Sequence, residues 1–385
     1  EADFKNFVDT AHSKGLKVIM DIVVNHTGDV NSYHDNKGFV STSQTPYKDA
    51  AGNPFNISDA ARWVTTCAQV GDSSCFPIMS SSIMPRDVYI PNGMPQRKPA
   101  FLNDLTNYHN RGDANDCGWA AGECAMMGDF SGLDDLMTEN PAVLQGWIQV
   151  YASWISRFGI DGFRVDTAKH VNPEFFDRWV PAMNRAASDA GKGQLTIFGE
   201  AWMDSATDLA GFARRYALQS VLDFPMRATM DGFASGQKTG KALLSAFSKD
   251  DYFNTGSKDS IVRNAYGLTT FLGNHDLGRA NGLIAGNTAD TGTNLLNRVK
   301  LANSVMYLVR GAPSVYYGDE TGIIGTGGGD ANYRQDMMPT QVAAWQRAAR
   351  IGAKPIGTKS MLSAAEEKSP IAVHIRALEA LRTKY

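Results

Sequence analysis

Short apolar runs alternate with longer helical patterns along most of this chain. The runs cover residues 17–24, 160–165, 195–200, 220–224, 267–272 and 313–318. Amphipathic helices are expected between several of them, most clearly over residues 144–158 and 295–306. Another helix opens the chain, with Phe4, Phe7 and Val8 on one face and Gly15 at its end. This alternation predicts parallel βαβ units, in which strands lie side by side and helices cover them.

The six runs fit strands 3–8 of a TIM-type (β/α)8 barrel, an α/β fold that closes with eight strands. The two remaining strands are expected upstream of Glu1, which is not an initiator methionine. Residues 1–26 would then form the first part of the barrel, with helix 2 and strand 3. Residues 140–385 would form the second part, with strands 4–8. Because a barrel without two of its strands has open edges, we expect this stretch to be poorly stable by itself.

The periodicity lapses over residues 27–139, which are rich in Gly, Asn, Ser, Asp and Pro. A structureless loop of that length is improbable inside a compact domain, so we predict an inserted, irregular subdomain B after strand 3. All four cysteines lie in it, without the CxxC spacing of a zinc site. Their spacing favours two disulfides, Cys67–Cys75 and Cys117–Cys124, each closing a short glycine-containing loop. Disulfides in turn favour a secreted or periplasmic protein.

Composition narrows the classes of partner. The 37 basic and 40 acidic residues leave a net charge of −3, which is too small to favour nucleic acid or an anionic membrane. The sequence has no apolar run of about 18 residues, the length that spans a bilayer. Its 18 Phe, 13 Tyr and 7 Trp supply the core that a disordered chain lacks. The remaining classes are an enzyme and a binding protein built on a large fold.

Polar residues end four of the six predicted strands. The segments are DIVVNH (21–26), GFRVDTAKH (162–170), GEAW (199–202) and FLGNHD (271–276). In a barrel these ends meet at one rim, where this fold places its chemistry. Each segment alone has a structural interpretation, such as a turn cap or a buried ion pair. Four such segments on one rim indicate an active site.

Three acids at this rim suit glycoside hydrolysis, in which one carboxylate attacks and one carboxylic acid donates a proton. They are Asp166, Glu200 and Asp276, and their repulsion should raise at least one pKa toward neutrality. Arg164 precedes Asp166 by two residues and faces the same side of the strand, where its charge should keep Asp166 ionised. Four further residues can bind sugar hydroxyls or the flat face of a pyranose ring: His26, His170, His275 and Trp202.

These segments resemble the signature regions of the α-amylase family, glycoside hydrolase family 13, and GLDDL at 132–136 resembles a fifth. The resemblance covers nearly the whole chain and is closest to exported bacterial α-amylases. It implies that Asp166 is the nucleophile, Glu200 the general acid/base and Asp276 the acid that stabilises the transition state. The expected substrate-binding residues are His26, Arg164, Lys169, His170, Trp202, His275, Asp330 and Arg334. Compared with this family, the chain looks like a fragment that lacks two barrel strands and a C-terminal β-domain.

The resemblance also implies a calcium ion. Asn25 occupies the position of a calcium-binding asparagine, and Asp129 and Asp135 reproduce a pair of acids six residues apart. The backbone carbonyl of His170 completes the expected ligands, a mixed oxygen set that suits Ca²⁺. The alternative is that the two acids only cap turns. Chloride is left open as a second ion, because Arg164 and Asn274 match two chloride ligands of the family.

The function implied by the resemblance is retaining endo-hydrolysis of α-1,4-glucosidic bonds in starch, glycogen and maltooligosaccharides. The Lys169–His170 pair is typical of α-amylases, whereas Asp134 replaces the proline of the usual LPDL segment. The alternative is an exo-glucosidase or a transglycosylase, such as trehalose synthase, that acts on maltooligosaccharides. A remote alternative is a barrel that binds without cleaving, as in amino-acid transporter heavy chains that have lost catalytic carboxylates. The expected partner is an α-glucan, and a monomer is expected.

Overall fold

The computed structural model describes residues 1–59, 76–119, 122–215, 218–254, 264–325, 329–363 and 366–385. The chain divides into two compact units. Unit 1 comprises Glu1–Ala201 and Arg215–Gln219, and unit 2 comprises Trp202–Arg214 and Ser220–Tyr385. The division does not test the predicted boundaries after residues 26 and 139, which stay predictions.

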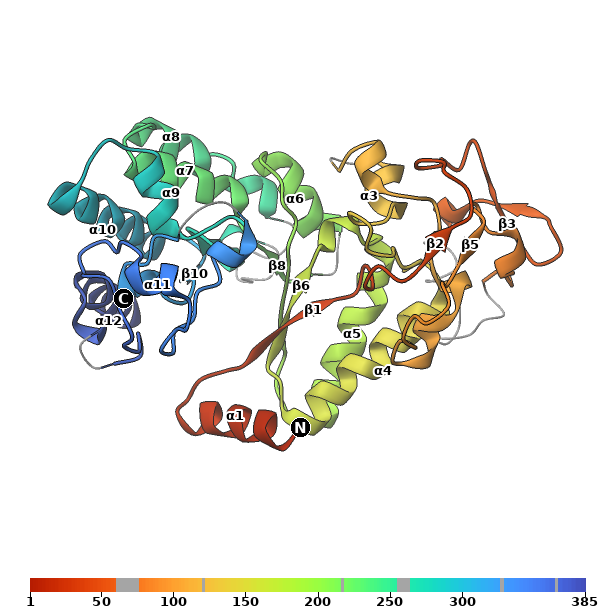
Figure 1. The fold of residues 1–385 in the computed structure, drawn as a ribbon, viewed down its shortest axis with the longest axis horizontal. Helices are drawn as coiled ribbons and strands as arrows, with labels where there is room; N and C mark the ends of the chain where they lie inside the picture. Colours follow the sequence, from red (N-terminus) through yellow and green to blue (C-terminus); the bar gives the residue numbers. More distant parts are fainter. Residues whose placement is uncertain (60–75, 120–121, 216–217, 255–263, 326–328, 364–365) are drawn as a thin grey trace. The chain divides into compact units, whose positions relative to one another are not determined.

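A parallel sheet forms the centre of unit 1. Its strands β1 (Ile19–Val23), β6 (Gly162–Asp166) and β7 (Thr196–Gly199) follow one another in that order (Figure 1). The register aligns Asp21 with Arg164 and Val23 with Asp166. Gly162 allows the close approach of β7, because a Cβ atom there would clash with the Thr196 carbonyl. The apolar runs predicted as strands at 17–24, 160–165 and 195–200 are therefore confirmed.

Long helices cover this sheet. The α-helices in the described residues of unit 1 are α1 (Ala2–Ser13), α3 (Glu123–Met127), α4 (Pro141–Phe158) and α5 (Pro173–Asp189) (Figure 1). Rings from α4 and α5 meet Phe163 of β6, with centroid distances of 5.7 Å to Tyr151 and 5.6 Å to Trp179. Both helices begin with proline after an asparagine, a favourable helix start. The opening helix and the helix over 144–158 are as predicted.

Helix α4 also fixes the end of β1. Trp147 Nε1 donates to the Val24 carbonyl (3.0 Å), and Tyr151 Oη donates to the Val23 carbonyl (2.7 Å). These carbonyls follow the last ladder pairs of β1, so the aromatic side chains replace partners that the ladder no longer provides. The helix therefore holds in place the strand end that leads to Asn25 and His26.

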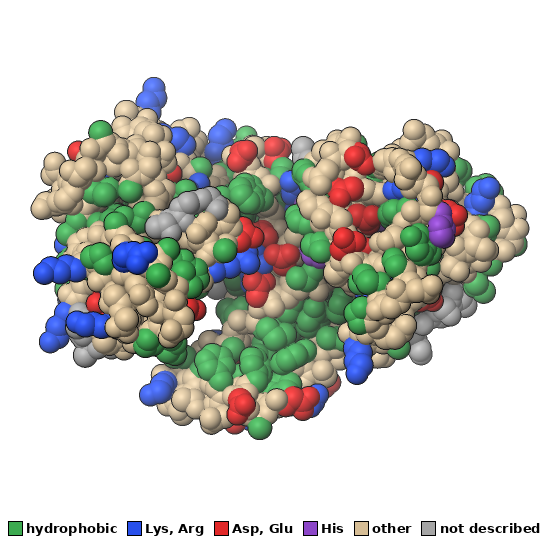
Figure 2. Space-filling view, in the orientation of Figure 1, with side chains coloured by type: hydrophobic (Ala, Val, Ile, Leu, Met, Phe, Trp, Pro, Cys, Tyr) green, Lys and Arg blue, Asp and Glu red, His purple; other side chains and the backbone are tan. Residues whose placement is uncertain are grey.

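The other edge of β1 is open in unit 1. Among the described strands of this unit, β1 pairs only with β6. Beside it lies a pocket of about 520 Å³, whose apolar lining includes Met20, Ile22, Trp147 and Trp154. Figure 2 shows hydrophobic side chains gathered on this face, over β1 and α4. It is the edge at which the predicted barrel requires further strands.

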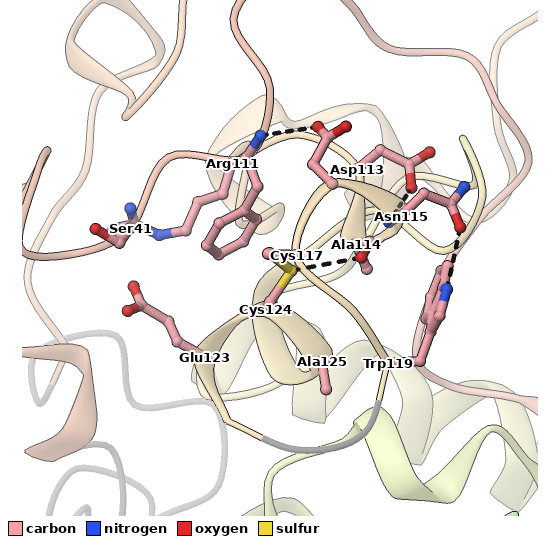
Figure 3. Close-up of a disulfide and its surroundings, with 12 residues drawn as sticks. Ser41, Arg111, Asp113, Ala114, Asn115, Cys117, Trp119, Glu123, Cys124 and Ala125 are labelled. Atoms are coloured by element: carbon pink, nitrogen blue, oxygen red, sulfur yellow. Dashed lines mark hydrogen bonds between the residues drawn. A yellow bond between two sulfur atoms is a disulfide. The ribbon is translucent and has the colours of Figure 1, made fainter.

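The described residues between 27 and 139 form short elements. Two antiparallel pairs join β2 (Ser32–Tyr33) to β5 (Val88–Tyr89) and β3 (Tyr47–Lys48) to β4 (Pro54–Phe55). A small core of Tyr47, Ile57, Phe76, Met127 and Met137 lies beneath them. The predicted Cys117–Cys124 disulfide is present, with Cα atoms 6.1 Å apart (Figure 3). The predicted Cys67–Cys75 bridge lies outside the described residues.

Unit 2 has parallel strands and a helical core. Strand β9 (Thr269–Phe271) pairs with β10 (Ala312–Ser314), and Leu222, just after β8 (Ser220–Val221), bridges to Thr269. Its helices are α6 (Ala206–Arg215), α7 (Phe224–Ala234), α8 (Gly240–Phe247), α9 (Ala280–Gly286), α10 (Gly292–Leu308), α11 (Ala343–Arg347) and α12 (Pro370–Lys384). Buried residues of α7, α9, α10 and α12 form one apolar cluster. The three remaining predicted strands and the helix over 295–306 are confirmed.

The alternation of parallel strands and helices is thus as predicted in both units. The described residues do not form a closed barrel, so the strand numbers 3–8 stay predictions. None of the helices in the described ranges combines the length and the apolar character needed to cross a bilayer.

Candidate active site

Arg164 joins three carboxylates at the end of the unit 1 sheet. Its Nη1 donates to Asp166 Oδ1 (2.6 Å) and to Asp21 Oδ1 (2.8 Å). Its Nη2 lies 2.9 Å from Glu200 Oε2, an ion pair without the geometry of a hydrogen bond. The parallel register explains this cluster, because it aligns Asp21 with Arg164 on the neighbouring strand. The predicted contact of Arg164 with Asp166 is present, and the same guanidinium reaches Glu200.

The three carboxylates stabilise the charged form of the Arg164 guanidinium. Burial alone would lower the pKa of Arg164, but the carboxylates of Glu200, Asp21 and Asp166 raise it above its ordinary value. The guanidinium therefore stays charged at every working pH.

The backbone around Asp166 and Glu200 is tightly held. Glu200 N donates to the Val165 carbonyl (2.8 Å), which extends the β6–β7 pairing to the end of both strands. Lys169 N donates to the Glu200 carbonyl (3.3 Å). Thr167, which directly follows Asp166, has a φ of 46°, a left-handed conformation that is strained for a β-branched residue. Such strain directly after the proposed nucleophile is typical of a functional strand end.

Two of the predicted sugar-binding histidines meet in an aromatic cluster. The Phe130 ring stacks on His26 (5.4 Å, 8°) and meets His170 edge-on (5.1 Å, 74°). Trp119 contacts Phe130 (4.6 Å) and His170 (5.8 Å). Figure 3 shows Trp119 beside the disulfide, with its indole Nε1 bonded to Asn115. The sequence analysis missed Phe130 and Trp119, because no motif marks them and their partners are distant in sequence.

His170 is neutral and its tautomer is fixed. Burial lowers its pKa to about 4. Its Nδ1 lies 2.6 Å from the Ala125 carbonyl, which can only accept, so Nδ1 carries the proton. The second ring nitrogen, Nε2, is then an acceptor. This side chain can receive a hydrogen bond from a sugar hydroxyl through Nε2.

Three of the four predicted calcium ligands, Asn25, Asp129 and Asp135, lie next to one another. Asn25 Nδ2 donates to Asp135 Oδ1 (2.9 Å), and Asp135 N donates to Asp129 Oδ1 (3.1 Å). Asn25 Oδ1 is buried without a hydrogen-bond partner, an unsatisfied oxygen of the kind that a hard cation binds. Asn25 and Asp135 therefore fit a calcium site. In the described ranges, no group of three or more His, Cys, Asp and Glu side chains is arranged to hold a metal.

His109 supplies a buried positive charge beside these acids. Only 1% of it is exposed, and its Nδ1 and Nε2 lie 2.5 Å from Asp135 Oδ2 and 3.0 Å from Glu139 Oε2. Burial would lower its pKa, but the charges of Glu139 and Asp135 raise it to about 9. The sequence analysis did not identify His109, because its partners lie 26 and 30 residues along the chain.

The acid of unit 2 has its own partners. Arg334 Nη2 donates to Asp276 Oδ1 (3.0 Å) and to Asp330 Oδ2 (3.2 Å). His275 Nε2 lies 3.1 Å from Asp276 Oδ2. Asn274 Oδ1 accepts from the backbone N–H groups of Asp276 and Leu277 and fixes the turn after β9. The structure thus brings together four predicted site residues of this unit: His275, Asp276, Asp330 and Arg334.

Trp202 and Lys169 are the remaining predicted substrate-binding residues. Trp202 is 46% exposed, and its ring stacks on Phe224 at 5.3 Å and 13°. Lys169 is half-buried, beside His170 in the turn after β6. Asp166, Glu200 and Lys169 belong to unit 1, whereas Trp202 and Asp276 belong to unit 2. The contacts described for each of these residues lie within its own unit.

Known proteins similar to this chain were found by sequence. A family model described as the catalytic domain of α-amylase matches residues 1–360. An α-amylase of Streptomyces lividans is 37% identical over 383 residues, which are 99% of this chain and 39% of that protein. A cyclomaltodextrinase of Thermoanaerobacter pseudethanolicus is 29% identical over 50% of this chain and 30% of that protein. The chain therefore spans less than half the length of these relatives.

Solved structures show the same fold. An α-amylase of Anoxybacillus is 23% identical with a TM-score of 0.63, and the match covers 100% of this chain and 60% of that one. An α-amylase of Geobacillus thermoleovorans, complexed with acarbose, is 21% identical with a TM-score of 0.58, covering 100% and 61%. These neighbours and the catalytic-domain match imply that the parallel strands belong to a TIM barrel. The resemblance drawn from the five sequence segments is confirmed, and the chain belongs to the α-amylase family of glycoside hydrolases.

Proposed function

We propose that this chain is the catalytic part of an α-amylase that cuts internal α-1,4-glucosidic bonds of starch, glycogen and maltooligosaccharides. The observation that carries the proposal is the pairing of Asp166 and Glu200 with one guanidinium, that of Arg164. Retaining glycosidases need two carboxyl groups about 5–5.5 Å apart on either side of the scissile bond. The shared guanidinium holds these two carboxyl groups close to each other.

The reaction uses the two acids in different protonation states. Glu200 donates a proton to the glycosidic oxygen as the bond from this oxygen to C1 breaks. Asp166 attacks C1 and forms a covalent glycosyl ester. Glu200 then takes a proton from water, whose oxygen attacks C1 and releases Asp166. Asp276, the third acid, stabilises the distorted sugar, and its hydrogen bond from Arg334 holds the carboxylate in place.

Substrate binding is assigned to the polar and aromatic side chains around these acids. His170 accepts a hydrogen bond from a sugar hydroxyl through Nε2, and His26 lies beside it across the Phe130 ring. Trp202 presents an exposed indole for stacking on a pyranose ring. The remaining residues proposed to contact the glucan are Arg164, Lys169, His275, Asp330 and Arg334.

We also propose that calcium binds at Asn25, Asp129, Asp135 and the carbonyl of His170. The unpartnered Asn25 oxygen beside the Asp135 carboxylate supports this assignment. The ion would tie the end of β1 to residues 129–135 and so supply rigidity rather than a chemical step. Chloride has less support, because the three carboxylates around Arg164 repel an anion.

Two further proposals concern the whole protein. Additional strands are proposed to complete the barrel at the open edge of β1, where the apolar pocket is found. The Cys117–Cys124 disulfide supports folding in an oxidising compartment, and hence export.

The test is the product profile on starch, maltose and pullulan, measured in the protein that carries this chain. An α-amylase should cut starch internally, act little on maltose and release the α-anomer first.

Asp166→Ala and Glu200→Gln should each lower the rate of starch hydrolysis by about 10³-fold or more. Asp161→Asn is the matched control, because it removes a carboxylate just before β6 that binds His12, Lys192 and the Val18 N–H. A tenth or more of the activity in either active-site variant, or a β-anomer, would contradict the assignment.

A further inference from the structure

Asp134, the residue that departs from the LPDL pattern, holds both ends of the segment after His26. Its carbonyl accepts the Thr27 N–H (3.0 Å). Its carboxylate Oδ2 accepts the N–H groups of Val30 (3.1 Å) and Asn31 (3.0 Å). One residue thus binds three backbone donors of residues 27–31. A proline at position 134 has no side-chain acceptor and would leave the Val30 and Asn31 donors without this partner.

Arg97 balances the charge of this carboxylate. Its Nη1 lies 3.2 Å from Asp134 Oδ2 and donates to Tyr108 Oη (2.7 Å), and its Nη2 donates to Asn31 Oδ1 (2.8 Å). The guanidinium also lies 4.8 Å from the centre of the Tyr108 ring. Both charged side chains are buried, with 9% of Arg97 and 4% of Asp134 exposed. We call this pair the Asp134–Arg97 clamp.

The clamp is coupled to His26 through short backbone connections. Leu136 N donates to the Asn25 carbonyl (2.8 Å), so the residues on both sides of His26 bind to the segment 134–136. The His26 ring itself stacks on Phe130, four residues before Asp134. Arg97, Thr27 and His26 line the same pocket. A shift of residues 27–31 would therefore turn His26 against Phe130.

We propose that the Asp134–Arg97 clamp is a positioning device, which fixes residues 27–31 and thereby the orientation of His26 toward the substrate. The inference rests on the proposed function, because its effect is on catalysis. Asp134 and Arg97 act through His26 and do not touch the glucan. An ion pair that only stabilised the fold would not need to bind the N–H groups of Val30 and Asn31. These groups lie in the loop that follows His26, a proposed substrate-binding residue.

A double-mutant cycle between Asp134 and His26 tests this coupling in the intact protein. Asp134→Ala should lower kcat/KM on starch by about tenfold or more, because small displacements of binding groups are costly in catalysis. In the His26→Ala background the same change should have less than about a twofold further effect. Equal losses in both backgrounds would overturn the proposal. Asp134→Asn, which keeps one acceptor oxygen, should recover part of the activity.

Two controls separate positioning from stability and from the proposed function. Lys98→Met removes an equal charge next to Arg97, at an exposed position, and should leave kcat/KM unchanged, whereas Arg97→Met should lower it. Amide hydrogen exchange at Val30 and Asn31 should be faster in Asp134→Ala and Asp134→Asn, and unchanged exchange would also overturn the proposal. If the wild-type protein releases no reducing ends from starch, the proposed function fails, and exchange alone then decides whether the clamp orders residues 27–31.

Discussion

At the scale of single residues, three sets of buried charges form small groups of opposite sign. Arg164 has three carboxylates, Arg97 has Asp134, and His109 has Asp135 and Glu139. An isolated buried charge strongly destabilises the folded state. Removing one member of a group is therefore expected to destabilise the fold, because it leaves its partner buried without an opposite charge. In all three groups, at least one member lies next to a proposed substrate or calcium residue.

The His109 group predicts a pH dependence of stability. Its folded pKa, raised from 6.5 to about 9, means that the folded state holds a proton more tightly than the unfolded state. The stabilisation is complete below about pH 6.5 and is lost as the pH rises through about 9, on the order of 3 kcal/mol in total. Denaturant unfolding in chelator at several pH values should show this decline. His109→Gln should be less stable at pH 6 and should lack the decline, whereas parallel curves would contradict the assigned charge.

At the scale of elements, the sequence predicted the strands and helices that have a recognisable apolar pattern. It did not predict the short strands and the ion pairs that depend on residues distant in sequence. All six apolar-rich runs contain strands, because short runs rich in β-branched and aromatic residues between turns favour buried strands. The two-residue strands β2–β5 gave no such signal, since a period cannot be read from two positions. The Asp21–Arg164 pair depends on the register of two strands that are 143 residues apart. The family motifs identified the acids, but not the side chains that hold them.

The Cys117–Cys124 disulfide closes a loop, and the effect of removing this disulfide can be tested. The loop carries Trp119 and leads into α3, whose Ala125 carbonyl fixes His170. In the chain-entropy model a loop of this length stabilises the fold by no more than about 3 kcal/mol. Replacing both cysteines by serine should therefore lower the melting temperature modestly and raise KM more than it lowers kcat. The matched control, Ser41→Ala with Ser43→Ala, removes two exposed hydroxyls nearby and should change neither. Unchanged KM in the serine variant would mean that the loop does not support the site.

At the scale of the whole molecule, calcium is expected to join elements that are distant in sequence. Saturation at 100 times the dissociation constant would add about 2.7 kcal/mol to the free energy of unfolding. A chelator should therefore lower the melting temperature of the wild type, and Asn25→Ala should abolish this sensitivity. Glu139→Gln perturbs His109 but removes no proposed ligand, so it should keep the response to chelator. A wild-type melting curve that is the same with and without chelator would remove calcium from this account.

The Asp134–Arg97 clamp has a consequence for how related sequences vary. Because the guanidinium balances one particular carboxylate, neither residue can be exchanged alone without leaving a buried charge. Relatives with an acid at position 134 should retain arginine at position 97 and a small polar residue at position 27. Relatives with proline at position 134 are free of that constraint, and all three positions should drift independently in them. The departure from the family pattern would then mark a separate lineage, inherited as a linked set of residues rather than as one substitution.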